Sequence, residues 1–171
     1  MYLSESEQFG IEFDLDNNYG GQWMFGRVCY RLGDIRIGDY DLGTSLRDIL
    51  YFWERIACYA NKRTNEKLML LNKEDLINLL SSGLFGNRLA SAELTERATN
   101  EEWARHDVIP TIDVFDNWHV FLVENDEMGR CIYQNLITMA CYECRLAHGE
   151  FDRVLNKAIQ SLSSILESQI D

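Results

Sequence analysis

The sequence predicts an α+β fold: a single domain over residues 1–171 with a largely antiparallel sheet, packed helices and a C-terminal amphipathic helix. Three observations carry this prediction. Residues 11–16 alternate strictly between apolar and acidic side chains, as a half-buried strand does. Residues 149–165 carry an apolar stripe at helical spacing. The strand-like segments fall in two groups with helices between and after them, which favours antiparallel pairing over βαβ units.

The first group of strands reads as a β-meander. Residues 17–21, rich in Asn and Gly, break the chain after the first strand. Residues 23–32 form a second strand with many aromatic side chains. The pair 33–34, Gly-Asp, fits a two-residue hairpin turn into a third strand at residues 35–37.

A helix follows the meander. Ser45, with Asp48 three residues later, fits a capping box at the helix start. Apolar side chains then recur at helical spacing to about Ala60, at Leu46, Ile49, Leu50, Trp53 and Ala57.

The middle of the chain reads as helical excursions on the surface rather than as a second domain. Residues 72–80 form a short helix capped by Asn72, with acidic residues in its first turn. Residues 81–83, Ser-Ser-Gly, are interpreted as the end of that helix. Residues 99–102 suggest the start of another helix, over residues 101–105.

The second group of strands comes after Pro110. Residues 118–124 are strongly β-prone, and the turn at residues 125–127 leads into a strand from Met128 to Gln134. Residues 137–146 add a further strand before the C-terminal helix.

The charge of the chain limits the classes of partner. Twenty-eight acidic against sixteen basic residues give a net charge of −12. Nucleic acids and anionic membranes attract basic surfaces, so neither is an expected partner. A basic protein or a cationic ligand would be attracted instead. The alternative is that the acidic charge serves solubility alone.

The N-terminal residues and the cysteines indicate the cellular compartment in which we expect the protein. The first seven residues are acidic and show no signal-peptide pattern, and no apolar run approaches the length of a membrane span. The cysteines are odd in number and scattered, at Cys29, Cys58, Cys131, Cys141 and Cys144. They therefore read as reduced thiols, and the expected location is the cytoplasm.

Candidate chemistry is weak in this sequence. Cys141 and Cys144, with His148, form the nearest approach to a zinc pattern, but a closed site needs four ligands and a strand would place the two cysteines on opposite faces. Glu102 and His106 share a helical face, yet the second histidine of a zincin motif is missing. No nucleophile elbow, P-loop or dinucleotide fingerprint occurs. We therefore predict no catalytic, cofactor-binding or metal-binding residues and no enzyme activity.

Two acidic clusters beside aromatic residues are the predicted partner-binding surface. The first cluster follows the first hairpin: Asp34, Asp39, Tyr40 and Asp41. The second surrounds the later strands: Asp113, Asp116, Trp118, Glu124, Asp126 and Glu127. Rings that anchor and carboxylates that pair with Lys or Arg suit a basic protein. Asp and Asn also favour turns, which explains the same residues without a partner. Four bulky rings are expected mainly in the core: Trp23, Phe25, Trp53 and Trp118.

Several blocks of the sequence resemble a known family. They are Gly21-Gln-Trp-Met-Phe-Gly-Arg27, Gly38-Asp-Tyr-Asp-Leu-Gly-Thr-Ser-Leu-Arg-Asp48, Val114-Phe-Asp-Asn-Trp-His-Val-Phe-Leu-Val-Glu124 and Gly149-Glu-Phe-Asp152. The family is the one numbered forty-two among the bacterial immunity proteins of polymorphic toxin systems. The blocks span about residues 9 to 165, with residues 62–110 not covered distinctively.

The resemblance implies a protein without catalysis, encoded beside a toxin such as a contact-dependent growth inhibition effector. Such a protein binds the C-terminal domain of the toxin in the cytoplasm, and thereby protects producer and sibling cells. A basic toxin domain, such as a nuclease, would fit the acidic charge. Two alternatives stay open: an adaptor for another basic protein, and an uncatalogued hydrolase that uses Glu102 and His106 or Cys144 and His148. The sequence leaves the oligomeric state undetermined.

Overall fold

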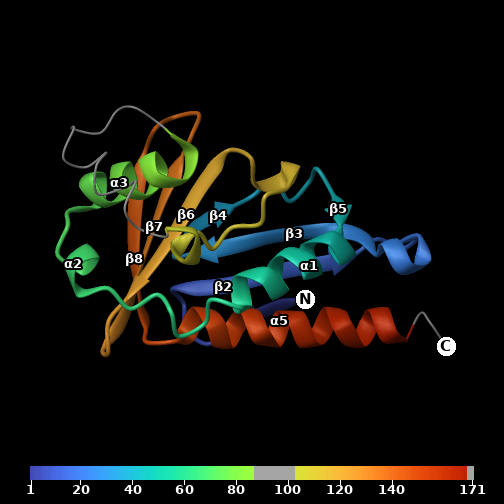
Figure 1. The fold of residues 1–171 in the computed structure, drawn as a ribbon. Helices are drawn as coiled ribbons and strands as arrows, with labels where there is room; N and C mark the ends of the chain where they lie inside the picture. The colour runs from blue at the N-terminus through green and yellow to red at the C-terminus, as the bar shows by residue number, and fades with distance from the viewer. Residues whose placement is uncertain (87–102, 169–171) are drawn as a thin grey trace.

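The antiparallel strands divide between two sheets whose strands run across one another (Figure 1). The computed structural model describes residues 1–86 and 103–168. The first sheet has the order β1 (Tyr2–Ser4), β2 (Phe9–Leu15), β3 (Phe25–Leu32) and β4 (Ile35–Ile37), with β5 (Thr44–Ser45) paired to β3. The second sheet has the order β6 (Trp118–Glu124), β7 (Met128–Asn135) and β8 (Cys141–Ala147). The predicted α+β class with antiparallel pairing is confirmed.

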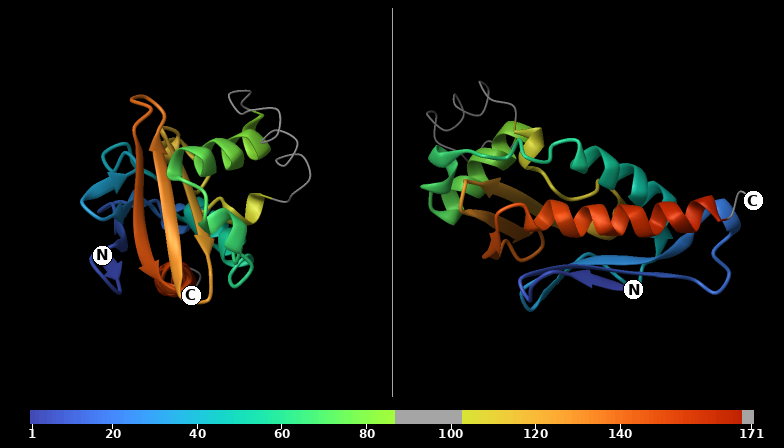
Figure 2. Two further views of the ribbon diagram at one scale, coloured as in Figure 1. Left: turned by 90° about the vertical axis from the view of Figure 1, so that its left-hand side faces the viewer. Right: turned by 90° about the horizontal axis from the view of Figure 1, so that it is seen from below.

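The helices cover both sheets. They are α1 (Leu46–Ala57), α2 (Glu66–Met69), α3 (Lys73–Phe85) and α5 (Glu150–Glu167), with short 3-10 turns η1 (Gly21–Trp23), η2 (Ala104–His106) and η3 (Asp113–Phe115). The predicted caps are present, because Ser45 accepts a hydrogen bond from the Asp48 amide and Asn72 accepts one from the Asp75 amide. Helix α5 lies lengthwise beside α1 and packs against β2 of the first sheet (Figure 2, right). Within residues 1–86 and 103–168, no helix combines the length and hydropathy needed to cross a membrane.

Strand β6 of the second sheet is buried on both faces, which explains the continuous apolar run at residues 120–123. Val120 and Leu122 of β6 face the main core, which β2, β3, α1 and α5 share. Phe121 and Val123, which alternate with them, join a second core under α3. Figure 2 (left) shows this sheet standing between the first sheet and α3. The sheet is therefore a central layer that holds α3 apart from the rest of the core.

Some predicted boundaries are wrong. Helix α3 continues through residues 81–83 and ends at Gly86, whose positive φ of 68° closes the helix. Gly83 allows the buried Trp103 ring to lie against the helix, since a Cβ at this glycine would be 2.0 Å from the ring. Strand β3 begins at Phe25 rather than residue 23, and β8 begins at Cys141 rather than residue 137. The helix predicted from residue 101 begins outside the described residues, and its end forms the 3-10 turn η2.

A buried ion pair ties together the segments that frame α1 and α5. Arg63 is fully buried, and its Nη1 donates to both carboxylate oxygens of Asp152 at 2.7 and 2.9 Å. Its Nη2 donates to the carbonyl oxygen of Ile56 at 2.8 Å, and its Nε donates to that of Arg105 at 2.8 Å. One side chain thus joins the end of α1, the turn η2 and the first turn of α5.

Candidate functional site

The two predicted acidic clusters meet at one place on the surface. The amide of Asp39, just after β4, donates to the carbonyl oxygen of Val114 in η3 at 2.7 Å. Gly38 has a φ of 104°, and a Cβ there would be 2.8 Å from the Phe115 ring. The loop after β4 therefore lies directly against η3. This contact joins part of the first cluster to part of the second.

We call the joined carboxylates the acidic face; they are Asp39, Asp41, Asp113 and Asp116, and all four are exposed. The Asp41 carboxylate lies 3.8 Å from Arg27, but it is 88% exposed, so this pair contributes little. Within the described part of the chain, no ion pair neutralises the other three. The acidic face therefore keeps most of its charge.

Tyr40 is half-buried beside the acidic face rather than free to act as an anchor. Its hydroxyl donates to Asp14 Oδ2 at 2.6 Å, and the Arg36 guanidinium lies 5.2 Å from its ring centre. The N-terminal ammonium and this hydroxyl hold the pKa of the Asp14 carboxyl below its usual value. Tyr40 thus supports the loop that carries Asp39 and Asp41.

The remaining residues of the second cluster lie elsewhere. Asp126 and Glu127 are exposed in the β6–β7 turn, at the opposite end of β6 from Asp116. Seven residues of strand separate them by about 20 Å. The prediction for Glu124 is wrong, because its side chain is only 2% exposed and accepts the amide of Gly149 at the start of α5. Asp34 is exposed in the β3–β4 turn, across the length of β4 from Asp39.

The predicted burial of the aromatic side chains is confirmed in part. Trp53 is fully buried, as predicted, and Trp118 is half-buried. The prediction that Trp23 and Phe25 lie in the core is wrong, since they are 52% and 44% exposed. They stack on one another at 6.4 Å, and the Arg47 guanidinium covers the Trp23 ring at 4.0 Å. Trp23 belongs to the turn η1 and not to the strand, and Phe25 lies on the exposed face of β3, which it shares with Arg27.

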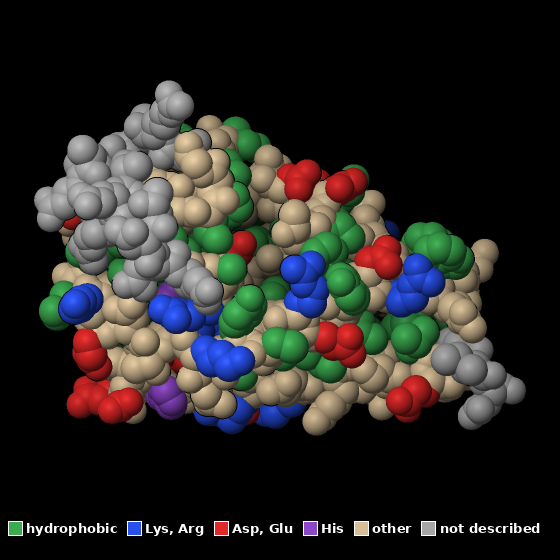
Figure 3. Space-filling model, viewed as in Figure 1, with side chains coloured by type: hydrophobic (Ala, Val, Ile, Leu, Met, Phe, Trp, Pro, Cys, Tyr) green, Lys and Arg blue, Asp and Glu red, His purple; other side chains and the backbone are tan. Residues whose placement is uncertain are grey.

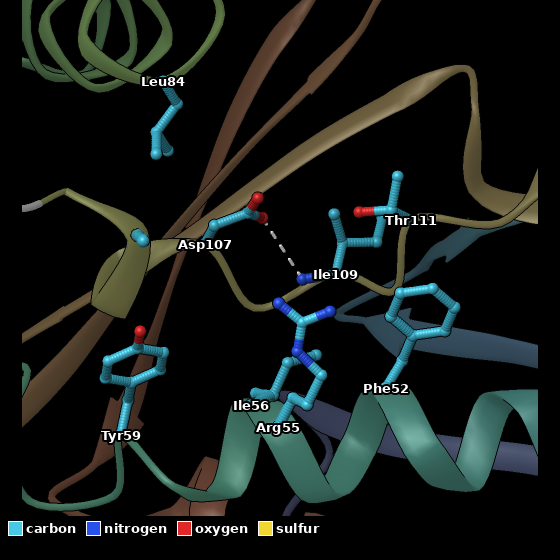
Figure 4. A pocket seen from close by; sticks show the side chains of 9 residues that line it. Phe52, Arg55, Ile56, Tyr59, Leu84, Asp107, Ile109 and Thr111 are labelled. Carbon is cyan, nitrogen blue, oxygen red and sulfur yellow. Dashed lines mark hydrogen bonds between the residues drawn. The ribbon is translucent and has the colours of Figure 1, made fainter.

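A recess in the surface, which the sequence did not predict, adjoins the acidic face. Asp107 follows η2, beside β6, and it lines two small cavities of about 150 and 140 Å³. The first cavity opens between α1 and α3: Phe52 and Arg55 project from α1, Tyr59 from the turn that follows it, and Leu84 from α3 (Figure 4). Figure 3 shows hydrophobic side chains gathered around this part of the surface.

The second cavity connects the recess to the acidic face. It shares Asp107, Ile109 and Thr111 with the first and is also lined by Asp116 and Trp118. We call the two cavities together the Asp107 recess. Asp116 and Trp118, from the second predicted cluster, therefore lie at a concave site. Asp107, which lines both cavities, was not predicted as a site residue.

Burial changes the pKa of the Asp107 carboxyl. It raises the pKa of this carboxyl to about 6, and the hydrogen bond from the Ile109 amide at 3.4 Å opposes the rise only weakly. A carboxyl whose pKa is raised in the folded state stabilises the fold fully below its unfolded pKa of about 4. That contribution is lost as the pH rises through about 6.

We expect Asp107→Asn to be more stable than the wild type, with an advantage that grows by about 1 kcal/mol between pH 5 and pH 8. The amide has the same shape and does not ionise. Urea unfolding of both proteins at the two pH values measures the difference. An advantage that does not change with pH would show that the ionised carboxylate carries no desolvation penalty.

The candidate metal residues do not converge. Cys144 is buried, whereas Cys141 on the same strand is half-buried and points to the other face, as the odd spacing predicts. The Nδ1 of His148 lies 2.7 Å from the carbonyl oxygen of Asn125. The Nδ1 of buried His106 lies 2.9 Å from that of Leu122, and burial lowers the pKa of this imidazole to about 4. Among residues 1–86 and 103–168, no three His, Cys, Asp or Glu side chains form a group suited to a metal ion.

One of the two predicted hydrolase pairs can be assessed, and the structure adds a Ser–His pair. Buried Cys144 has its Sγ 3.9 Å from the carbonyl oxygen of Gln8, whereas exposed His148 contacts that of Asn125, so these two side chains do not converge. Glu102 lies outside the described residues, so the pair with His106 is not placed. Ser81 Oγ lies 3.3 Å from Nδ1 of His119, and the imidazole stacks on Phe85 at 4.4 Å. In the described part of the chain, no carboxylate is hydrogen-bonded to the His119 ring, so a Ser-His-acid arrangement is incomplete.

The fold and the surface thus define an acidic α+β protein whose concave, carboxylate-bearing face suits a protein partner, and comparison with known proteins gives the class. Residues 1–161 match a family described as Immunity protein 42. The chain belongs to this immunity-protein family, as the resemblance implied.

A solved structure shares the fold. It is described as "Crystal structure of CdiI from Burkholderia dolosa AUO158" and has a TM-score of 0.73 and 21% sequence identity to this chain. The similarity covers 94% of this chain and 99% of the other. No curated protein matches the chain.

Proposed function

We propose that this protein binds and neutralises the C-terminal domain of a cognate polymorphic toxin, such as a contact-dependent growth inhibition effector. It would do so in the cytoplasm of producer and sibling cells, as one domain that acts by occupying the toxin rather than by transforming a substrate. The observation that carries this proposal is the match of residues 1–161 to an immunity-protein family.

The acidic face supports binding to a basic toxin domain. Asp39, Asp41, Asp113 and Asp116 are exposed and belong to a chain with a net charge of −12. Opposite charges on two partners raise the association rate by about 10- to 1000-fold. Rapid capture has a clear use when the partner is a toxin that destroys its substrate by turnover. A nuclease domain, which must hold a polyanion, has the charge that this face favours.

The size of the Asp107 recess also favours contact with a protein side chain over the binding of a small substrate there. The two cavities of the Asp107 recess, of about 150 and 140 Å³, are smaller than the usual 300–1000 Å³ of a site for a drug-sized ligand. The recess is large enough for one protruding side chain. A rigid sheet beneath the face loses little conformational entropy when the partner docks.

Co-expression with the toxin domain encoded by the neighbouring upstream gene tests the proposal. We expect this protein to restore growth of cells that express the toxin domain, and to copurify with it as a stoichiometric complex. A toxin domain from an unrelated system serves as the control and should neither be captured nor lose its toxicity. Capture without rescue would indicate an adaptor instead, and absence of both would refute the proposal.

A further inference from the structure

The Asp107 recess places one carboxylate among side chains from several elements. Asp107 lies between Leu84 of α3 and the side chains of Phe52 on α1 and Tyr59 just after it (Figure 4). The Phe85 and Trp118 rings line the second cavity on the other side of the same carboxylate. The carboxylate therefore lies where two cavities meet, and each cavity has aromatic side chains in its lining.

The size of the recess fits one planar group. Each cavity has a volume of about 150 or 140 Å³. A cavity of roughly 150 Å³ in another protein is known to hold a benzene molecule. A guanidinium group is planar, smaller than benzene, and stacks on aromatic rings. A cofactor or a large metabolite would not fit.

The Asp107 carboxylate has no cationic partner among the described residues. Within residues 1–86 and 103–168, its side chain accepts a hydrogen bond only from the amide of Ile109, at 3.4 Å. Arg55 is exposed, and its guanidinium extends from α1 toward Asp107 and Ile109 (Figure 4). It lies 5.8 Å from the Tyr51 ring centre, and no ion pair among the described residues joins it to Asp107. His119 in the second cavity is neutral at pH 7, because burial lowers its pKa below the ordinary value. Burial of an acidic group without a cation is unfavourable, so the free protein keeps a group that a partner could satisfy.

We propose that the Asp107 recess receives one arginine side chain of the bound toxin domain, with the guanidinium paired to the Asp107 carboxylate and stacked among the surrounding rings. This inference rests on the proposed function. Arginine fits better than lysine, because its planar fork can pair with both carboxylate oxygens while its faces contact aromatic side chains. The neighbouring acidic face would then guide the same basic surface into place.

The affinity of matched variants for the toxin domain tests the inference. Asp107→Asn should weaken binding by about 30- to 1000-fold, mainly through faster dissociation, because it leaves a desolvated guanidinium without its anion. Asp113→Asn removes the same charge from the exposed acidic face and should weaken binding by less than about 3-fold. Arg55→Ala should raise the affinity, since it removes a positive charge that repels a guanidinium entering the recess.

Calorimetry and surface plasmon resonance measure these differences. If urea unfolding shows that Asp107→Asn is at least as stable as the wild type, as predicted, unfolding is not the cause of its weak binding. Equal affinities of Asp107→Asn and Asp113→Asn for the toxin domain would overturn the inference while leaving the proposed function intact.

A small guanidinium compound tests binding at the recess in the absence of the toxin domain. Titration of the isotopically labelled protein with n-butylguanidinium should shift the amide resonances of Asp107, Ile109 and Thr111, and Asp107→Asn should abolish these shifts. The expected affinity is weak, so millimolar probe is used. If the probe leaves those resonances unchanged in the wild type, the recess is not a guanidinium site. Failure of the toxin domain to bind the wild type would instead refute the proposed function, whatever the probe does.

Discussion

Replacement of Arg63 by methionine is expected to lower the free energy of unfolding by about 3–5 kcal/mol. The change leaves the Asp152 carboxylate, which Arg63 holds at 2.7 and 2.9 Å, without a counter-ion in a largely buried place. It also removes the donors to the carbonyl oxygens of Ile56 and Arg105. Domains of this size are commonly stable by only about 5–15 kcal/mol, so the loss is a large share of the total. Urea unfolding followed by circular dichroism measures it.

A double mutant shows how much of this loss belongs to the ion pair. Arg63→Met combined with Asp152→Leu removes both charges, so the pair should show a coupling energy of about 1–3 kcal/mol. Arg63→Lys is the conservative control: it keeps the charge, loses the two-pronged contact, and should be destabilised as well. If Arg63→Met lowers stability by less than about 1 kcal/mol, the buried pair does not hold α1, η2 and α5 together.

Reversal of the acidic face to lysine should reduce the association rate constant with the toxin domain by about 10- to 1000-fold. The quadruple variant carries Asp39→Lys, Asp41→Lys, Asp113→Lys and Asp116→Lys, and it changes the net charge from −12 to −4. The wild-type rate should fall with added salt, whereas the variant's rate should lose most of this dependence. Stopped-flow mixing at several salt concentrations measures both.

A second quadruple variant controls for net charge. Asp16, Glu66, Asp126 and Glu127 are equally exposed but lie away from the loop contact between Asp39 and Val114. Their reversal to lysine gives the same net charge and should slow association by less than about 5-fold. Equal effects of the two quadruple variants would mean that overall charge, and not the acidic face, controls capture.

Much of the fold follows from local patterns. The alternation at residues 11–16 and the cap at Ser45 depend on neighbours in the chain, and both are present in β2 and α1. The continuous apolar run of β6 predicts a strand but not its two cores, because no local pattern tells which elements cover each face. The division into two sheets likewise depends on contacts between distant segments.

The candidate site was less predictable for the same reason. Asp39 and Asp113 come together through a hydrogen bond across more than seventy residues, which loop composition alone does not reveal. The position of Glu124 at the end of a strand, beside a turn, predicts an exposed side chain. In the structure its carboxylate is buried and accepts a hydrogen bond from the amide of Gly149. Asp107 carries a weak signal, a single charge before the apolar Val108 and Ile109, and that signal becomes meaningful only when α1 and α3 enclose it.

Hydrogen–deuterium exchange of the free protein and of its complex with the toxin domain tests the central claim most directly. Our account predicts slower exchange on binding in residues 38–42 and 104–117, which contain the acidic face and Asp107. Protection confined to the β6–β7 turn at residues 125–128, or to the backbone amides of residues 23–25, would contradict it.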